Sequence, residues 1–256
     1  MTLRAEGLTL GYGDRLVLEN LSLVVPAGAV TAILGPNGCG KSTLLRAFAR
    51  LIRPMAGRVT LGGDDIHRKD TKAIARHIAI LPQAPLAPEG IAVGDLVKRG
   101  RAPWRGLMSP WSLADSKACT NALDAVAMTP MAGRPLAELS GGQRQRAWLA
   151  LVLAQATPVV LLDEPTTFLD LPHQLEVLSL LRQRNREAGT TVVSVLHDLN
   201  LAARFSDHLI LLGPDGPIAE GPPETVVTPE NLDRAFGLAA LVQPDPVTGR
   251  PMVIPL

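Results

Sequence analysis

Gly35-Pro-Asn-Gly-Cys-Gly-Lys-Ser-Thr43 is the stretch of sequence that decides the fold. It matches the phosphate-loop pattern G-x-x-x-x-G-K-[ST], whose defined positions are occupied by Gly35, Gly40, Lys41 and Ser42. The apolar, β-branched run Ala29–Leu34 precedes the loop and predicts a buried strand. The run Leu44–Ile52 follows it, apolar at helical spacing, and predicts a helix that Pro54 ends. Strand, glycine loop and helix is the order that a backbone cradle for phosphate requires.

The residue types in this loop suit an anion. The glycines let backbone N–H groups approach a phosphate that would clash with a Cβ, and the helix points its partly positive N-terminus at the same place. Lys41 is expected to add a charge at the β- and γ-phosphates and to assist catalysis, and the Ser42 hydroxyl to ligate Mg²⁺. The alternative is a glycine-rich turn that matches by chance. The residues predicted to bind the nucleotide here are Gly35, Pro36, Asn37, Gly38, Cys39, Gly40, Lys41, Ser42 and Thr43.

The composition is that of an ordinary globular protein. The 256 residues are 46% hydrophobic with a formal net charge of +1, which gives no electrostatic reason to expect nucleic acid or an anionic membrane as partner. Two cysteines offer no disulfide framework, and the chain opens without a signal-peptide pattern. No run reaches the ~18 apolar residues that a membrane span needs. We therefore expect a cytoplasmic protein. If it functions at a membrane, other chains must span that membrane.

One of the two cysteines lies inside the phosphate loop. Cys39 is placed at the start of the predicted helix, where the helix N-terminus favours the thiolate. This setting predicts a reactive thiol whose alkylation blocks nucleotide binding.

The chain divides by pattern into an α/β core and a helical insertion. Residues 3–25, 58–66 and 76–83 read as strands, the first pair joined by a turn at 11–14. Alternation is then lost over 84–157, where three stretches are helical in pattern: Val93–Arg99, Leu113–Ala127 and Gln143–Gln155. We predict one domain over 1–256, with the α/β core and a β subdomain in 1–83 and 158–256 and a helical subdomain in 84–157. The segment Arg101–Trp111 contains two of the three tryptophans and is either a loop that faces a partner or apolar packing within the helical part.

After the insertion the α/β pattern returns. Val159–Leu162 and Thr190–Leu196 are continuous apolar runs typical of buried parallel strands, and Leu171–Ala188 between them predicts a helix stopped by Gly189. A short helix over Asn200–Phe205 and a hairpin over His208–Gly221 follow. Little pattern remains beyond Gly221, so we expect no large C-terminal regulatory domain.

Polar residues close the predicted strands at their C-terminal ends, the edge where open α/β sheets bind ligands. Asp163 is placed to hold Mg²⁺, and the adjacent Glu164 to polarise a water for attack on the γ-phosphate. Gln83 is placed to contact both the metal and that water, and His197 the γ-phosphate. Two acids at a strand end are also common as a solvated terminus, and a lone histidine is often structural. Tyr12, in the turn between two glycines, either stacks on a purine or is an amphipathic surface residue.

The stretch Leu139-Ser-Gly-Gly-Gln143 separates the possible classes of phosphate-loop protein. Ser140 and Gln143 have capping-box spacing at a helix start. Gly141 and Gly142 leave that helix end bare, so that a phosphate can reach its N–H groups. The alternative is a well-capped helix without a ligand.

These motifs, in their order and spacing, resemble the nucleotide-binding subunit of ABC transporters over almost the whole chain. The resemblance implies a phosphate-loop NTPase of ABC type, with a RecA-like α/β core, an N-terminal antiparallel β subdomain and an inserted α-helical subdomain. It implies ATP and Mg²⁺ as cofactors, with Tyr12 on adenine, Gln83 in the Q-loop and His197 as the switch histidine. It also implies a head-to-tail homodimer, in which Asp170 lies in the loop that crosses the interface. Each ATP then lies between one phosphate loop and the partner's copy of Ser140, Gly141, Gly142 and Gln143.

A narrower resemblance concerns the transported molecule. Thr166–Leu178 and Val195–Arg204 are similar to the ATPases of iron–siderophore, haem and vitamin B12 importers, and Lys98–Trp104 to the ferric-siderophore branch. This implies uptake of a ferric siderophore, with haem or vitamin B12 as the alternatives. The implied partners are a membrane permease and, indirectly, a substrate-binding protein, with the chain peripheral at the cytoplasmic face. The five histidines are scattered without ligand spacing, so the chain itself is not expected to bind iron.

Two other classes of function are argued against by the sequence. Soluble ABC ATPases of DNA repair or translation usually carry a long coiled coil or two ATPase units, and neither is visible here. The near-neutral charge offers no footprint for nucleic acid. A phosphate-loop kinase or GTPase is disfavoured by Leu139–Gln143.

Overall fold

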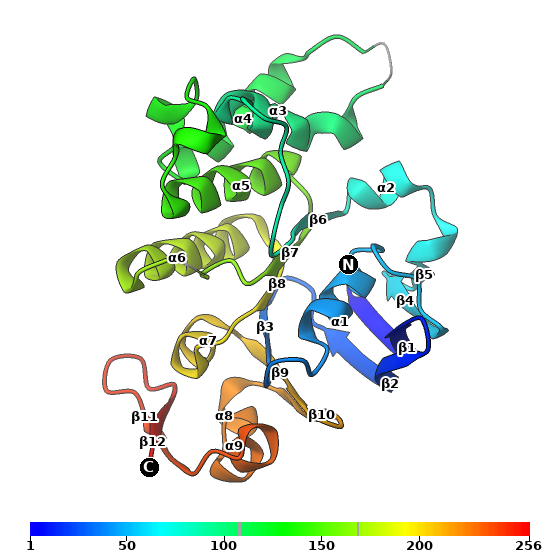
Figure 1. The fold of residues 1–256 in the computed structure, drawn as a ribbon, viewed down its shortest axis with the longest axis vertical. Helices are drawn as coiled ribbons and strands as arrows, with labels where there is room; N and C mark the ends of the chain where they lie inside the picture. Colours follow the sequence, from blue (N-terminus) through cyan, green and yellow to red (C-terminus); the bar gives the residue numbers. More distant parts are fainter. Residues whose placement is uncertain (107–108, 168) are drawn as a thin grey trace.

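The computed structural model describes residues 1–106, 109–167 and 169–256 (Figure 1). Leu107 and Met108 of the Trp-containing segment, and Phe168 of the Thr166–Leu178 stretch, lie outside the described residues. A six-stranded sheet runs through the centre in the order β10-β9-β3-β8-β7-β6. Its strands are β3 (Val30–Leu34), β6 (Ile78–Leu81), β7 (Val159–Asp163), β8 (Thr191–Val195), β9 (His208–Gly213) and β10 (Gly216–Gly221).

Four parallel pairings organise this sheet. β3 pairs with β8 and β9, and β7 pairs with β6 and β8. The continuous apolar runs predicted as buried strands are β3, β7 and β8, and every residue of these strands is buried. Parallel pairing brings the carboxyl ends of β3, β6, β7 and β8 to one edge, so the segments that follow them meet there.

The two faces of the sheet are covered by different elements, because successive side chains of a strand point to opposite sides. Ile33, Leu161 and Val193 pack with α1 (Lys41–Phe48) and with the N-terminal strands. Val160, Leu162 and Val192 face the other way and pack with α5 (Gly141–Gln155) and α6 (Leu171–Ala188). Figure 1 shows these helices on their opposite sides of the sheet.

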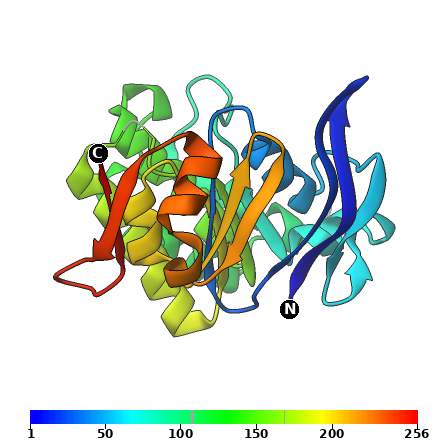
Figure 2. The same cartoon turned by 90° about the horizontal axis from the view of Figure 1, so that it is seen from below.

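The N-terminal strands form a second, antiparallel sheet in the order β2-β1-β4-β5. Its members are β1 (Leu3–Tyr12), β2 (Arg15–Val25), β4 (Ala56–Leu61) and β5 (Asp64–Asp65), followed by η1 (Ile66–Arg68) and α2 (Thr71–Ala75). The strands expected in this part of the chain are therefore confirmed. Figure 2 shows this sheet at the end of the molecule opposite the C-terminal hairpin.

The helix after the phosphate loop is shorter than predicted. α1 ends at Phe48, and Pro54 does not end it. Arg50 adopts a left-handed conformation with φ 60°, and the Leu51 N–H donates to the Arg46 carbonyl at 2.8 Å. This closing turn satisfies the last carbonyls of the helix before the proline is reached.

Helices dominate between β6 and β7, as the loss of alternation predicted. They are α3 (Val93–Lys98), η2 (Arg99–Trp104), α4 (Leu113–Ala125), η3 (Thr129–Met131), η4 (Leu136–Glu138) and α5. α3, α4 and α5 share one buried apolar cluster, to which β6 and β7 also contribute. The limits of this insertion as a subdomain, 84 and 157, stay a prediction.

The tail beyond β10 has more structure than the sequence pattern predicted. It forms α8 (Pro223–Val226), α9 (Pro229–Phe236) and a hairpin of β11 (Ala240–Pro244) with β12 (Pro251–Pro255). The sequence is misleading here because prolines usually break elements, whereas Pro223 and Pro229 lie at first-turn positions that need no N–H donor. In α7 (Leu199–Phe205), the Asn200 amide holds the hairpin by donating to the Val253 carbonyl at 3.2 Å and accepting from the Val253 N–H at 2.7 Å. Within the described ranges, no helix has both the length and the apolar character that crossing a bilayer demands.

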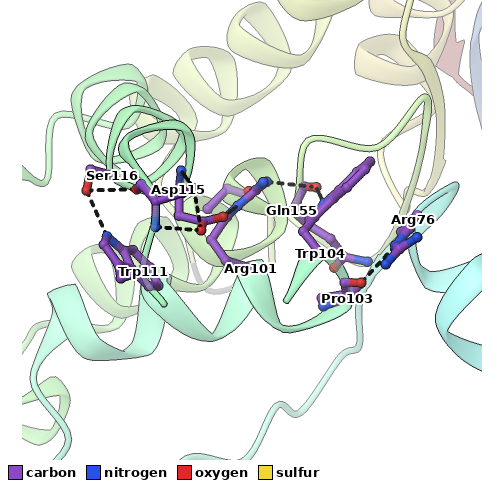
Figure 3. A network of polar contacts seen from close by, with 10 residues as sticks. Arg76, Arg101, Pro103, Trp104, Trp111, Asp115, Ser116 and Gln155 are labelled. Atoms are coloured by element: carbon purple, nitrogen blue, oxygen red, sulfur yellow. Dashed lines mark hydrogen bonds and ion pairs between the residues drawn. The ribbon is translucent and has the colours of Figure 1, made fainter. Parts of the chain in front are cut away.

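A polar network ties the tryptophan-containing segment to its surroundings (Figure 3). Arg101 is buried and pairs with the buried Asp115 at 2.9 Å, while its Nη1 donates to the Ala154 carbonyl at 2.8 Å. The Trp104 and Trp111 indoles are partly exposed and donate to the Gln155 carbonyl and the Ser116 hydroxyl. These two tryptophans are therefore held by polar contacts and not by packing in the apolar core.

Loss of the Arg101 guanidinium should destabilise the fold. In Arg101→Leu the carboxylate of Asp115 stays buried without its partner, and we expect the free energy of unfolding at pH 7 to fall by about 3 kcal/mol in urea denaturation. Hydrogen bonds from Ser112 and Arg101 lower the pKa of Asp115 to about 2. A lowered carboxyl pKa stabilises the fold at neutral pH, and this stability is lost as the pH falls from about 4 towards 2. The difference between wild type and variant should shrink over that interval.

Arg58→Leu is the matched control, because Arg58 and Glu6 form an exposed pair at 2.7 Å. Solvent screens such a pair, so little change in stability is expected. Equal losses in the two variants would contradict a special role for the buried pair.

Candidate functional site

A cavity of about 430 Å³ opens at the carboxyl edge of the central sheet. It is formed by the β3–α1 loop, the turn between β1 and β2, and the residues that follow β6 and β7. Its lining is made by Tyr12, Arg15, Val17, Asn37, Gly38, Gly40, Lys41, Ser42, Thr43, Gln83 and Glu164. Most of the phosphate-loop prediction thus lies around one cavity with Tyr12, Gln83 and Glu164. Arg15 and Val17 were not predicted, because no motif marks them and only the pairing of β1 with β2 places them there.

The glycines of the loop are required by close packing as well as by the turn. A Cβ on Gly35, which has φ 147°, would lie 2.4 Å from the Leu212 carbonyl oxygen of β9. Gly38 has φ 82° and open space beside it, and it lines the cavity. The loop therefore has its back against β9 and leaves an unobstructed surface towards the cavity.

Lys41 carries a buried charge into the loop. Lys41 is only 6% exposed, and its Nζ donates to the carbonyls of Gly35 and Pro36 at 2.7 Å each. Among the described residues no carboxylate lies within ion-pair distance of this ammonium. Carbonyl oxygens solvate the charge but do not neutralise it, so an anion in the cavity would be stabilised.

Ser42 and Asp163 bring oxygen ligands together beside Lys41. The Ser42 hydroxyl donates to Asp163 Oδ1 at 2.8 Å, and Asp163 Oδ2 is buried without a hydrogen-bond partner among the described residues. Burial raises the pKa of Asp163, because it removes solvent that would stabilise the charged carboxylate. An orphaned carboxylate oxygen next to a hydroxyl is the kind of donor set that suits Mg²⁺. The described residues contain no cluster of three His, Cys, Asp or Glu side chains able to hold a metal, so further ligands would have to come from groups such as Gln83 and phosphate.

Glu164 is held by a histidine and a threonine. Its Oε1 lies 2.8 Å from His197 Nε2, and its Oε2 accepts from the Thr167 hydroxyl at 2.9 Å. Burial opposes ionisation most strongly, but the hydrogen bonds from His197 and Thr167 outweigh it and leave the pKa of Glu164 below its usual value. His197 thus has a carboxylate partner at the site. Thr167 was missed by sequence reasoning, and its spacing of three residues from Glu164 was the available signal.

Two predicted groups lie away from this cavity in the same chain. Ser140 caps α5 in the expected capping box with Gln143, and Gly141 is exposed with open space around it. Asp170 caps α6 and contacts His173. The cavity lining includes neither group, so one chain does not bring them to the phosphate loop.

The thiolate predicted for Cys39 is wrong. Cys39 is 5% exposed, and burial raises the pKa of its thiol despite the nearby Lys41. Its Sγ lies only 2.7 Å from where a Cβ of Gly35 would be, so the side chain is turned into the back of the loop. Desolvation of the thiolate there outweighs the helix N-terminus.

The fold and this cavity define a phosphate-loop nucleoside triphosphatase with a second helix N-terminus, capped by Ser140 and begun by Gly141 and Gly142. Residues 18–167 match the sequence pattern of the family described as ABC transporter. The chain belongs to this family and is one of its ATP-hydrolysing subunits.

The chain is similar to two transport proteins over nearly their whole length. It is 50% identical over 248 residues to the achromobactin transport ATP-binding protein CbrD of Dickeya dadantii, covering 97% of this chain and 92% of that one. It is 50% identical over 254 residues to the ferric enterobactin transport ATP-binding protein FepC of Escherichia coli, covering 99% and 94%.

Solved structures agree on the fold. An inward-facing metal-chelate type ABC transporter superposes with a TM-score of 0.85 at 30% identity, over 100% of this chain and 97% of that one. A dimeric bacterial ABC transporter cassette superposes with a TM-score of 0.78 at 29% identity, over 86% and 98%. The ABC-type α/β fold expected from the sequence is thereby confirmed.

Burial of both thiols predicts slow alkylation of the native protein. At pH 7 the native protein should react with N-ethylmaleimide far more slowly than the same protein in urea, because Cys39 and Cys119 are both buried with raised thiol pKa values. The measurement is the rate of mass increase for each cysteine by peptide mapping. Labelling of native Cys39 as fast as in urea would contradict the inward orientation.

Proposed function

We propose that this chain is the ATP-binding and hydrolysing subunit of an importer of ferric siderophores. The observation that carries the proposal is its near-full-length identity of 50% to two siderophore-transport ATP-binding proteins. The cavity at the sheet edge supports the ATP-hydrolysing part of this proposal, because it combines a phosphate loop with a carboxylate held beside it. The chain would act as a homodimer at the cytoplasmic face of the membrane, attached to separate permease subunits that receive cargo from a substrate-binding protein.

ATP would lie along the cavity. Tyr12, half exposed at the end of β1, offers its ring to adenine, and Arg46 donates to its hydroxyl at 3.4 Å. The triphosphate would lie on the loop Gly35–Thr43, where the start of α1 and the ammonium of Lys41 supply positive potential. Lys41 would exchange its bonds to the loop carbonyls for the β- and γ-phosphates.

Ser42, Asp163 and Gln83 are the residues that would hold Mg²⁺. The unpartnered Oδ2 of Asp163 is the observation in favour of this assignment. When bound, the ion neutralises charge that develops on the phosphate oxygens.

Glu164 would act as the general base. It accepts a proton from a water whose oxygen attacks the γ-phosphorus, and the bond from that phosphorus to the ADP oxygen breaks, leaving ADP and phosphate. The lowered pKa of Glu164 keeps the carboxylate ionised at neutral pH. His197, already within hydrogen-bond distance of Glu164, would hold the carboxylate and reach the γ-phosphate.

The second wall of the site would come from another copy of the chain. Ser140, Gly141, Gly142 and Gln143 present a capped helix end away from their own cavity, and Gly141 is exposed. A head-to-tail dimer would bring this end to the partner's γ-phosphate, with Asp170 near the interface. The dimeric state of a similar cassette supports this arrangement. Haem and vitamin B12 remain the alternative cargoes.

Glu164→Gln tests the hydrolytic assignment. The amide cannot accept the proton of the attacking water, so we expect turnover to fall by about 10²-fold or more while ATP binding persists. ATP should then trap the variant as a stable dimer in size-exclusion chromatography. Turnover near the wild-type rate would show that Glu164 is not the base.

Lys41→Ala is the control for this experiment. It removes the charge that holds the phosphates, so ATP affinity itself should fall and no ATP-dependent dimer should form. Unchanged ATP affinity in this variant would contradict the phosphate-loop assignment.

The cargo is tested by uptake in cells that lack the chain. We expect loss of ⁵⁵Fe uptake from ferric enterobactin or another ferric siderophore, restored by the wild-type chain and not by Glu164→Gln. Hemin and cobalamin uptake, measured in the same cells, should be unaffected. Normal siderophore uptake together with lost hemin or cobalamin uptake would assign the chain to the alternative cargo.

A further inference from the structure

A hydrogen bond joins the helix that begins at Ser140 to the turn that contains Glu164. Gln145 lies in the second turn of α5, and its Nε2 donates to the Pro165 carbonyl at 3.0 Å. Pro165 directly follows Glu164. The bond therefore connects the helix that Ser140 caps to the proposed base of the same chain. In the proposed dimer the capped helix end and the base lie at different ATP sites.

The turn at Glu164 is one that needs external support. Glu164 has φ 55°, a left-handed conformation that is costly for a residue with a side chain. A following proline further disfavours helical and favours extended conformations at this position. Such a backbone persists only where neighbouring contacts hold it, so each contact to the turn affects where the carboxylate points.

The known contacts to this turn come from several elements. Thr167 closes it by donating its N–H to the Glu164 carbonyl at 3.3 Å and its hydroxyl to Oε2 at 2.9 Å. His197 approaches Oε1 from the segment after β8. From α5, Gln145 adds a hydrogen bond to the carbonyl of Pro165, the residue after Glu164.

The first turn of α5 touches the same loop further along. A Cβ on Gly142 would lie 3.3 Å from the side chain of Leu169, which is buried. Gln174 of α6 holds the other side of that residue by donating to the Leu169 carbonyl at 2.9 Å. α5 thus lies against the chain after β7 at Pro165 and at Leu169, so a shift of α5 acts on both residues.

We propose that Gln145 is a positioning residue that sets the orientation of Glu164 according to the position of α5. The inference rests on the proposed function, in which Glu164 is the base and the N-terminal end of α5 binds the ATP held by the partner. Because α5 is a continuous helix, movement of its capped end carries Gln145 with it. ATP captured at one site would in this way align the base at the other.

Gln145→Leu tests this role, because leucine fills similar space and cannot donate. We expect kcat for ATP hydrolysis to fall by about tenfold, since small misalignments of a reacting group cost one to two orders of magnitude. The KM for ATP, ATP-dependent dimerisation and the melting temperature should stay close to wild type. Gln145→Lys keeps a donor of sufficient reach and should recover part of the lost kcat.

Gln174→Leu is the matched control, because it removes a hydrogen bond to the same loop from α6 instead of α5. Its kcat should fall much less. A kcat for Gln145→Leu equal to that of wild type would overturn the inference. An equal fall of kcat in both variants would also overturn it, because it would show that only general support of the loop matters.

The double variant Gln145→Leu with Glu164→Gln separates this inference from the proposed function. If Gln145 acts through Glu164, adding Gln145→Leu to Glu164→Gln should not lower turnover below that of Glu164→Gln alone. An additional tenfold fall would overturn the inference and leave Glu164 as the base. Wild-type turnover in Glu164→Gln alone would instead overturn the function on which the inference rests.

Discussion

Parallel pairing of β3, β8, β7 and β6 is the constraint on which the site depends. The four strands end at one edge, so the segments that follow them meet although they are distant in the sequence. The phosphate loop follows β3, Glu164 follows β7, Gln83 follows β6 and His197 follows β8. Burial of the apolar strands stabilises this pairing, and the polar residues just beyond the strands form the proposed catalytic site.

Charge is distributed at this edge so that the chain alone does not satisfy it. The ammonium of Lys41 is solvated only by neutral carbonyls among the described residues, and the carboxylate of Asp163 keeps one buried oxygen without a partner. Both are costly in a protein interior, and a bound phosphate and a bound cation would relieve these costs. Glu164 differs, because His197 and Thr167 already satisfy its two oxygens. The site therefore combines two charged groups that lack a full set of partners with a carboxylate, the proposed base, that neighbouring side chains already hold.

Much of the fold was predictable, because local pattern reports local structure. The bounds of α6 agree with the residues predicted, since Asp170 caps its start and Gly189 ends it in a left-handed conformation. Prediction failed where two local signals compete, or where tertiary burial overrides a local one. Prolines in the tail concealed α8 and α9, and the left-handed turn at Arg50 ended α1 before Pro54. At Cys39 the helix N-terminus was weighed without burial, which local sequence does not reveal.

The sequence by itself determined the strand–loop–helix around Lys41, the capping box at Ser140 and the acidic pair after β7, because each is a local arrangement of residue types. The tertiary structure alone decided which of these meet. It brought His197 to Glu164, turned the Cys39 thiol away from the cavity, and left Ser140 outside the site of its own chain. It also placed Gln145 on the Pro165 carbonyl, twenty residues away along the chain. These contacts depend on how the helices pack against the sheet, and the spacing of residues along the sequence does not show which distant residues come into contact.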